Sequence, residues 1–308
     1  MEGVVYFGLH TLDVNSWRNQ SLIDAALNAA MELIIKINDS GYASVKVPED
    51  WSMVPHSSRT FWDKLNEVFK GQNDLLTFVT TKLFNEVFNK CLVKNVSYET
   101  AEQSIKSENP NLEKMEYYAA LKLDKNWPQV SPDLHVSNDK DMYNVALKFL
   151  TEAPFNEASY SGRSSKIFSN LIFGSGFAGA LNGHGTTSEL SKYSKAPTTG
   201  ICGFSSGVTK SLMTLNLIDL NGKTTTDILA EVAAKSGFGC TVEGGKNQHL
   251  KFQCNDGDEV KTINCEFHIK INSNNENDGV YYQDRIYFGF FGQGADQKIF
   301  VAHSGKHL

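Results

Sequence analysis

The chain has 308 residues, of which 41% are hydrophobic and 21% charged, a composition that argues against disordered and fibrous classes. Its 29 Lys and Arg residues are outnumbered by 35 Asp and Glu residues, and the resulting net charge of -6 provides no global positive field to attract nucleic acid. Any contact with nucleic acid must therefore be local.

The first residues and the cysteines give expectations about the compartment. Met1–Phe7 lacks the basic start and the apolar centre of a secretion signal, and no apolar run approaches the roughly 18 residues of a membrane-spanning helix. We therefore expect a cytoplasmic protein with no membrane partner. The 5 cysteines are widely spaced and include no Cys-x-x-Cys pair, so neither a disulfide framework nor a zinc ribbon is indicated, and no cofactor is expected.

The first elements alternate between strand and helix. Val4–Leu9 predicts a short buried strand, residues 20–38 a helix rich in Leu, Ala, Met and Ile, and Tyr42–Val47 a second strand that ends at Pro48. Helices are expected over 60–69 and 74–92. The chain therefore opens as an α/β lobe.

A polar stretch punctuated by prolines follows, over residues 95–138. We interpret it as an irregular excursion from the first lobe, with one helix near Glu113–Leu121. A further helix is expected over 139–150, and residues 155–205 are dense in Gly, Ser and Thr. These features place an N-terminal mixed α/β lobe over 1–155 and a second domain over 156–308.

The second domain is predicted to be α+β. Helices over 208–217 and 226–236 are separated by an Asp219–Gly222 turn, and the second helix has threonines at its start and Gly237 just past its end. Segments with strand periodicity follow, and Asn255–Asp258 is a good turn between the first two of them. Those segments are His249–Cys254, Cys265–Ile271, Arg285–Phe291 and Lys298–His303.

Alternation within these segments separates an apolar face from a polar one. In the second segment Phe267, Ile269 and Ile271 alternate with Glu266, His268 and Lys270. Antiparallel pairing of the segments would gather the polar members on one wet sheet face. This predicted face comprises His249, Lys251, Glu266, His268, Lys270, Arg285 and Tyr287.

The residue types on this face suit cleavage of RNA without a metal ion. That reaction needs a base for the 2'-hydroxyl, an acid for the leaving oxygen, and cations that stabilise charge on the phosphate. We assign His268 as the base, with Tyr287 or Glu266 as the acid or orienting group. Lys270 and Arg285 would bind the phosphate, and the residues expected to contact the rest of the substrate are His249, Lys251, Lys306 and His307.

A C-terminal sheet of this kind, with helices packed on it, resembles the small sheet ribonucleases of the RelE and colicin type. The resemblance covers about residues 205–308 and depends on residue types, because no diagnostic motif is present. It implies a ribonuclease of the toxin or defence kind, with RNA or another phosphodiester as the substrate. The N-terminal lobe would then serve recognition, regulation or binding of a protein partner.

Several alternatives remain open at this point. The polar face could be a solvated surface whose charges pair across strands, in a protein that binds a ligand or partner without catalysis. Gly203–Gly207 fits the nucleophile elbow of a serine hydrolase, with Ser205 as the nucleophile, and also fits a turn that caps the following helix. Gly174–Gly179 matches a dinucleotide-binding pattern, but Asn182–Gly185 would break the helix that such a site requires.

Metal sites are weaker interpretations. His303 and His307 are four residues apart, yet Gly305 makes the helix that would aim both at one ion improbable. A metal nuclease would need an acid before a Glu-x-Lys triplet, and here Lys270 is displaced from Glu266 by two positions. We therefore predict no metal site.

Overall fold

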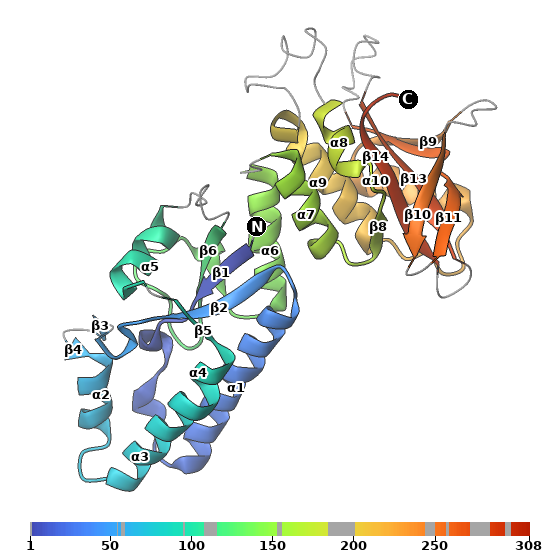
Figure 1. Ribbon diagram of the computed structural model, residues 1–308. Helices are drawn as coiled ribbons and strands as arrows, with labels where there is room; N and C mark the ends of the chain where they lie inside the picture. Colours follow the sequence, from blue (N-terminus) through green and yellow to red (C-terminus); the bar gives the residue numbers. More distant parts are fainter. Residues whose placement is uncertain are drawn as a thin grey trace. The chain divides into compact units, whose positions relative to one another are not determined.

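The computed structural model describes residues 2–53, 55–56, 59–94, 96–107, 116–152, 156–183, 201–243, 250–256, 259–271, 284–292 and 297–308 (Figure 1). The chain is of the α+β class, as predicted, and divides into two compact units, Met1–Phe149 and Leu150–Leu308. The division lies a few residues before the boundary expected after residue 155. In these ranges no helix combines the length and the apolar character needed to cross a bilayer.

Unit 1, Met1–Phe149, contains a parallel sheet in the order β5-β2-β1-β6-β7. Its central strand β1 has Val4 and Val5 fully buried, because helices cover both faces of such a sheet. The strand, helix, strand opening predicted from the sequence is present as β1, α1 and β2. The bounds are β1 Glu2–Tyr6, β2 Ala43–Pro48, β5 Leu92–Lys94, β6 Glu116–Leu121 and β7 His135–Val136.

The helices of unit 1 follow from apolar spacing and capping residues. In α1 (Gln20–Asp39) the side chain of Asn19 accepts a hydrogen bond from the Leu22 N–H, and Ile23, Leu27 and Ile34 are buried at helical spacing. The remaining helices are α2 Phe61–Val68, α3 Asn73–Lys82, α4 Phe88–Lys90 and α5 Tyr98–Lys106, and α6 Asp139–Glu152 begins in unit 1 and ends just past its last residue, Phe149. Shorter elements are η1 Leu9–Thr11, η2 Val14–Ser16, η3 Trp51–Met53, β3 Pro55–His56, β4 Arg59–Thr60, the π-helical turn η4 Leu83–Val87 and η5 Pro132–Leu134.

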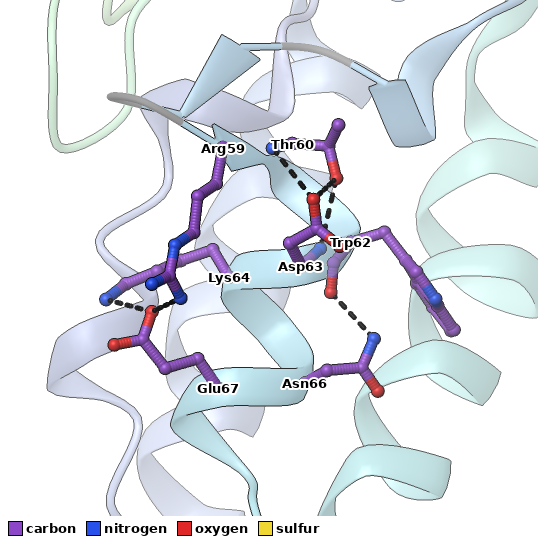
Figure 2. A network of polar contacts seen from close by, with 7 residues as sticks. All are labelled: Arg59, Thr60, Trp62, Asp63, Lys64, Asn66 and Glu67. Carbon is purple, nitrogen blue, oxygen red and sulfur yellow. Dashed lines mark hydrogen bonds and ion pairs between the residues drawn. The ribbon is translucent and has the colours of Figure 1, made fainter.

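The start of α2 shows how local polar contacts fix a helix end. Figure 2 shows the Thr60 and Asp63 side chains in a reciprocal capping box, in which Thr60 Oγ1 accepts from the Asp63 N–H and Asp63 Oδ2 accepts from the Thr60 N–H. One turn later Glu67 pairs with Arg59 at 3.1 Å and with Lys64 at 3.4 Å. Because the ion pairs are exposed, they contribute little to stability. The capping box is the contact that marks where the helix begins.

The structure corrects the interpretation of residues 95–138. The described part of this stretch contributes one helix and two strands of the unit, namely α5, β6 and β7. The expected helix near Glu113–Leu121 is wrong, because β6 pairs in parallel with β1. Five of its six residues are buried, and a continuous apolar run of this length gives no periodicity that separates a buried strand from a helix.

Unit 2, Leu150–Leu308, contains a sheet in the order β8-β14-β13-β12-β9, with a separate hairpin of β10 and β11. Only the β14–β8 pair of this sheet is parallel, and the other neighbours are antiparallel. The strands are β8 Leu171–Phe173, β9 Gly239–Val242, β10 Lys251–Asp256, β11 Glu259–Asn264, β12 Phe267–Lys270, β13 Asp284–Phe291 and β14 Lys298–Lys306. The helices are α7 Glu157–Ile167, α8 Phe177–Ala180, η6 Leu181–Gly183, α9 Ile201–Leu217 and α10 Thr225–Ser236.

The two faces of this sheet are covered differently (Figure 1). On one face α9 approaches closely enough that a Cβ at Gly207 would meet Ile271 Cγ2 at 2.7 Å. On the other face the β10–β11 hairpin lies over one end of the sheet, where the Asn264 backbone packs directly on Gly289. The hairpin and the sheet share an apolar cluster that includes Cys254, Tyr287 and Phe291. The opposite end of this second face carries the polar side chains considered below.

Three predictions for this unit need correction. The Asn255–Asp258 turn does not join the first two predicted strands, because β11 comes between them and pairs with β10. The stretch 155–205, predicted only as rich in turn residues, contains α7, β8 and α8. The nucleophile elbow at Gly203–Gly207 lies inside α9, where Ser205 is buried and its hydroxyl donates to the Thr151 carbonyl at 2.5 Å. A turn that caps a helix at Val208 is also excluded, since α9 begins at Ile201.

Candidate functional site

The strand register brings several predicted site residues onto one face of the C-terminal sheet. His268 of β12 lies opposite Tyr287 of β13, and Lys270 lies opposite Arg285. On the outer side of β12, Thr241 of β9 is the partner of His268. Because partners in an antiparallel ladder project to the same side, these side chains share a face.

This face is less exposed than the alternation predicted. His268 and Arg285 are each 4% exposed, and Tyr287 is fully buried. The expectation of a wet face is therefore wrong for these three residues. Strand periodicity separates the two faces of a sheet but does not reveal what covers each of them, and the Tyr287 ring belongs to the apolar cluster that the hairpin closes.

Glu243, the residue after β9, is the centre of the polar cluster. Its backbone N–H donates to the Glu266 carbonyl at 2.7 Å, which extends the β9–β12 ladder by one residue. Its carboxylate Oε2 accepts from the Tyr287 hydroxyl at 3.3 Å, and lies 3.3 Å from His268 Nδ1 and 3.6 Å from His307 Nε2. One half-buried carboxylate thus collects a phenol and two imidazoles from three parts of the chain.

Electrostatics divide the roles of the two imidazoles. Burial lowers the pKa of His268 to about 4 even though Glu243 opposes the shift, and the charges of Arg285 and Lys270 lower it further. His268 is therefore neutral near pH 7. Its Nε2 lies 3.1 Å from Thr241 Oγ1, and its Nδ1 is buried close to the Glu243 carboxylate without a hydrogen bond to any described residue. The His307 side chain is 41% exposed, so it is the imidazole of this cluster that solvent can reach.

The neutral Tyr287 hydroxyl donates a hydrogen bond to the Glu243 carboxylate. Burial raises the pKa of Tyr287 to about 12, helped by the negative charge of Glu243 and opposed by Arg285 and a contact with the Leu308 backbone. The phenol consequently keeps its proton across the physiological range and can donate to the carboxylate. An exposed imidazole beside a carboxylate that is itself held by a buried phenol is suited to accept a proton from a bound hydroxyl group.

Comparison with protein-family models, with curated proteins and with solved structures found no match for this chain. The site is therefore interpreted from its geometry. Within the described ranges, no group of three or more His, Cys, Asp or Glu side chains is arranged to hold a metal ion.

The remaining predicted residues are more scattered. Lys251 lies on the β10–β11 hairpin and not on the five-stranded sheet, which corrects the shared face drawn from the sequence. Glu266 contributes its backbone carbonyl to Glu243. Lys306 ends β14, exposed and adjacent to His307, and its carbonyl lies 2.8 Å from His303 Nε2. His249 lies outside the described residues.

Glu243 was missed in the sequence because β9 was not predicted. Gly237 was assigned correctly as the residue that ends a helix, and the segment after it is short. Alternation was nevertheless present there, since Cys240 and Val242 alternate with Thr241 and Glu243. Pairing of this segment with the strand of His268 would have placed Thr241 and Glu243 on the polar face.

Neither the Gly174–Gly179 pattern nor the His303 and His307 pair forms a ligand site in the described ranges. The helix after Gly174–Gly179 is short, since α8 ends at Ala180, so the long helix required by a dinucleotide site is lacking. Arg163 of α7, the arginine that precedes this pattern in the sequence, is 1% exposed and so is closed to a phosphate from solvent. His303 and His307 lie on and just after a strand, as expected from Gly305, and do not share a helix face.

Proposed function

We propose that unit 2 cleaves RNA at the Glu243 cluster, by attack of a 2'-hydroxyl on the adjacent phosphorus. The observation that supports this proposal is the chain of contacts from Tyr287 to Glu243 to the exposed His307. The same order of groups occurs in catalytic sites where a carboxylate orients the base and a further donor holds the carboxylate. The resemblance to the RelE and colicin ribonucleases points in the same direction.

In this mechanism His307 is the base and Glu243 is its positioning residue. The 2'-oxygen forms a bond to phosphorus as its proton moves to the imidazole, and the bond from phosphorus to the 5'-oxygen breaks. The leaving oxygen takes a proton from water, so that the products are a 2',3'-cyclic phosphate and a 5'-hydroxyl end. Lys270 and Lys306 stabilise the negative charge that builds up on the phosphate oxygens.

This assignment changes the role predicted for His268. Because it is 4% exposed and its pKa is about 4, His268 stays neutral beside Glu243 and does not act as the base. Arg285 is buried, and its charge acts on the cluster from within the sheet, as its effects on the pKa values of His268 and Tyr287 indicate.

The test uses two matched single-stranded oligonucleotides, one of RNA and one with the same sequence in 2'-deoxy form. We expect the purified protein to cut only the RNA, to leave cyclic phosphate ends, and to do so equally well with a chelator present. Cleavage of the deoxy strand, or loss of activity with the chelator, would contradict attack by the 2'-hydroxyl at a site without metal.

A second candidate function is binding of a ligand or partner without catalysis, and the burial of His268 and Arg285 favours it. A buried polar network of this kind also stabilises a sheet by itself. The same oligonucleotides distinguish the two candidates. Saturable binding of RNA with no cleavage product over long incubation would support a binding protein. If RNA is neither bound nor cleaved, RNA is excluded as the substrate and as the ligand.

A further inference from the structure

Unit 1 contains a switch point in its parallel sheet. The chain passes from β1 to β2 and β5 on one side, then returns to β6 and β7 on the other, so the strand order reverses between β1 and β6. Loops after two such strands diverge, and the space outside their carboxyl ends is where open α/β sheets bind ligands. In this unit those ends are Tyr6 of β1 and Leu121 of β6.

One side of the switch point is closed by aromatic packing. The His10 ring lies 4.8 Å from the Trp127 ring and 5.3 Å from the Tyr98 ring, measured between centroids. Gly8 is required there because a Cβ would come within 2.7 Å of the Trp127 ring. This packing leaves little room for a ligand on that side.

The other side is hollow. A cavity of about 240 Å³ lies between α1 and the loops that follow β1, β6 and β7. Its apolar wall comes from Leu12 and Leu33 and from the small side chains of Ala26, Ala29 and Ala30 of α1. Alanines at these positions leave open a space that larger side chains would fill.

Asp124 is the second charged residue that lines the cavity, and contacts with the loop after β1 hold its carboxylate in place. Asp124 accepts from the Asp13 N–H at 2.7 Å, and Lys125 pairs with Asp13 at 3.1 Å. The N–H groups of Asp124 and Lys125 both donate to the Thr11 carbonyl, at 2.9 and 3.0 Å. These bonds tie the loop after β6 to the loop after β1 and fix the cavity entrance.

Lys122 is the cation that this rim leaves available. Its backbone N–H donates to the Val136 carbonyl at 2.8 Å, its side chain is half-buried, and it lines the cavity. Across the described residues it makes no ion pair, in contrast to Lys125 beside it. A half-buried lysine that lines a cavity with a largely apolar wall suits a small anion with an apolar body.

We propose that this cavity binds a small amphipathic organic anion, with its carboxylate or phosphate on Lys122 and its apolar part against the alanine face of α1. The volume suits a single ring or a short chain, because larger ligands occupy cavities of about 300 to 1,000 Å³. The site lies wholly within unit 1 and does not depend on the RNA chemistry proposed for unit 2.

The test measures binding of two probes to the full chain by fluorine NMR, 4-fluorophenylacetate and 4-fluorophenyl phosphate. We expect at least one probe to bind saturably, and the difference between them identifies the preferred anion. Lys122→Met should weaken binding about 10-fold or more, as expected for loss of one charge-assisted contact. Ala26→Leu should abolish binding by filling the cavity, and Lys140→Met, on an exposed lysine of α6, should leave it unchanged.

Far-UV circular dichroism of each variant checks that the fold is kept, and Lys122→Met alone decides the question if Ala26→Leu does not fold. The proposal is overturned if neither probe binds at millimolar concentration. It is equally overturned if binding is the same in Lys122→Met as in Lys140→Met, since the anion would then be held elsewhere.

Discussion

The residues that contact the Glu243 side chain are distant from it in the sequence. Tyr287 donates to it from β13, His268 faces it from β12, and His307 reaches it from the segment after β14. The residue types for proton transfer could be predicted from the sequence, and four of the predicted residues do share a sheet face. The central carboxylate of Glu243 could not be predicted, because its position depends on the pairing of β9 with β12. The short sequence of β9 does not indicate that pairing.

The pH dependence of stability tests the buried state of His268. Its pKa is about 4 in the folded protein against 6.5 ordinarily, so the unfolded chain binds this proton more readily. The contribution to the free energy of unfolding is complete above pH ~6.5 and is lost as the pH falls towards 4. Across that window we expect wild type to lose about 1–3 kcal/mol more than His268→Gln in urea unfolding. Parallel pH profiles would show that His268 is not buried as described.

Labelling with a fluorophosphonate tests the position of Ser205. Ser205 is 5% exposed within α9 and its hydroxyl donates to the Thr151 carbonyl, so this serine is not an activated nucleophile. We expect mass spectrometry to find Ser205 unmodified after exposure of the native protein to the probe. A labelled Ser205 would restore the serine hydrolase interpretation.

At the scale of elements, the sequence was informative where a pattern was long or was ended by a specific residue. Helix α1 and the alternation in β12 and β13 were predictable for this reason. Strand β6 was not, because Tyr117 to Leu121 form one unbroken buried run. The hairpin strand β11 was missed as well, and with it the cover that buries Tyr287.

A glycine in β13 tests how the hairpin packs on the sheet. A Cβ at Gly289 would overlap the Asn264 carbonyl oxygen, so Gly289→Ala must push the hairpin away from the sheet. We expect a loss of about 1–3 kcal/mol in the free energy of unfolding, as for other overpacked sites. The control is Gly162→Ala in α7, where a Cβ meets nothing within 4 Å, and where about 0.5–1 kcal/mol should be gained. Equal effects of the two substitutions would contradict the packing described.

At the scale of the whole molecule, the chain combines two units with different sheets. Local patterns predicted their classes, a mixed α/β lobe and an α+β domain, because strands and helices follow one another differently in each. The strand orders could not be predicted from local patterns. They depend on pairing between strands that are distant in the sequence, β6 with β1 and β14 with β8.

Two compact units predict two unfolding events. We expect calorimetry to resolve two transitions, and the anion that binds at Lys122 to raise the temperature of only one of them. Substitution of Lys122 should abolish this shift and leave the second transition in place. A single transition that moves as a whole with the ligand would contradict independent units.

In the proposed mechanism Glu243 positions His307, the base that takes the proton from the attacking 2'-hydroxyl of RNA. The most direct measurement is the single-turnover rate of RNA cleavage by wild type, Glu243→Gln and Glu231→Gln, the last a partly exposed residue of α10 that pairs with Lys223 and Lys235 and is not part of the Glu243 cluster. We expect a loss of about 100-fold or more for Glu243→Gln, because His307 loses the carboxylate that orients it and with it the contribution of general-base catalysis, and a wild-type rate for Glu231→Gln. Equal rates in all three proteins would contradict it.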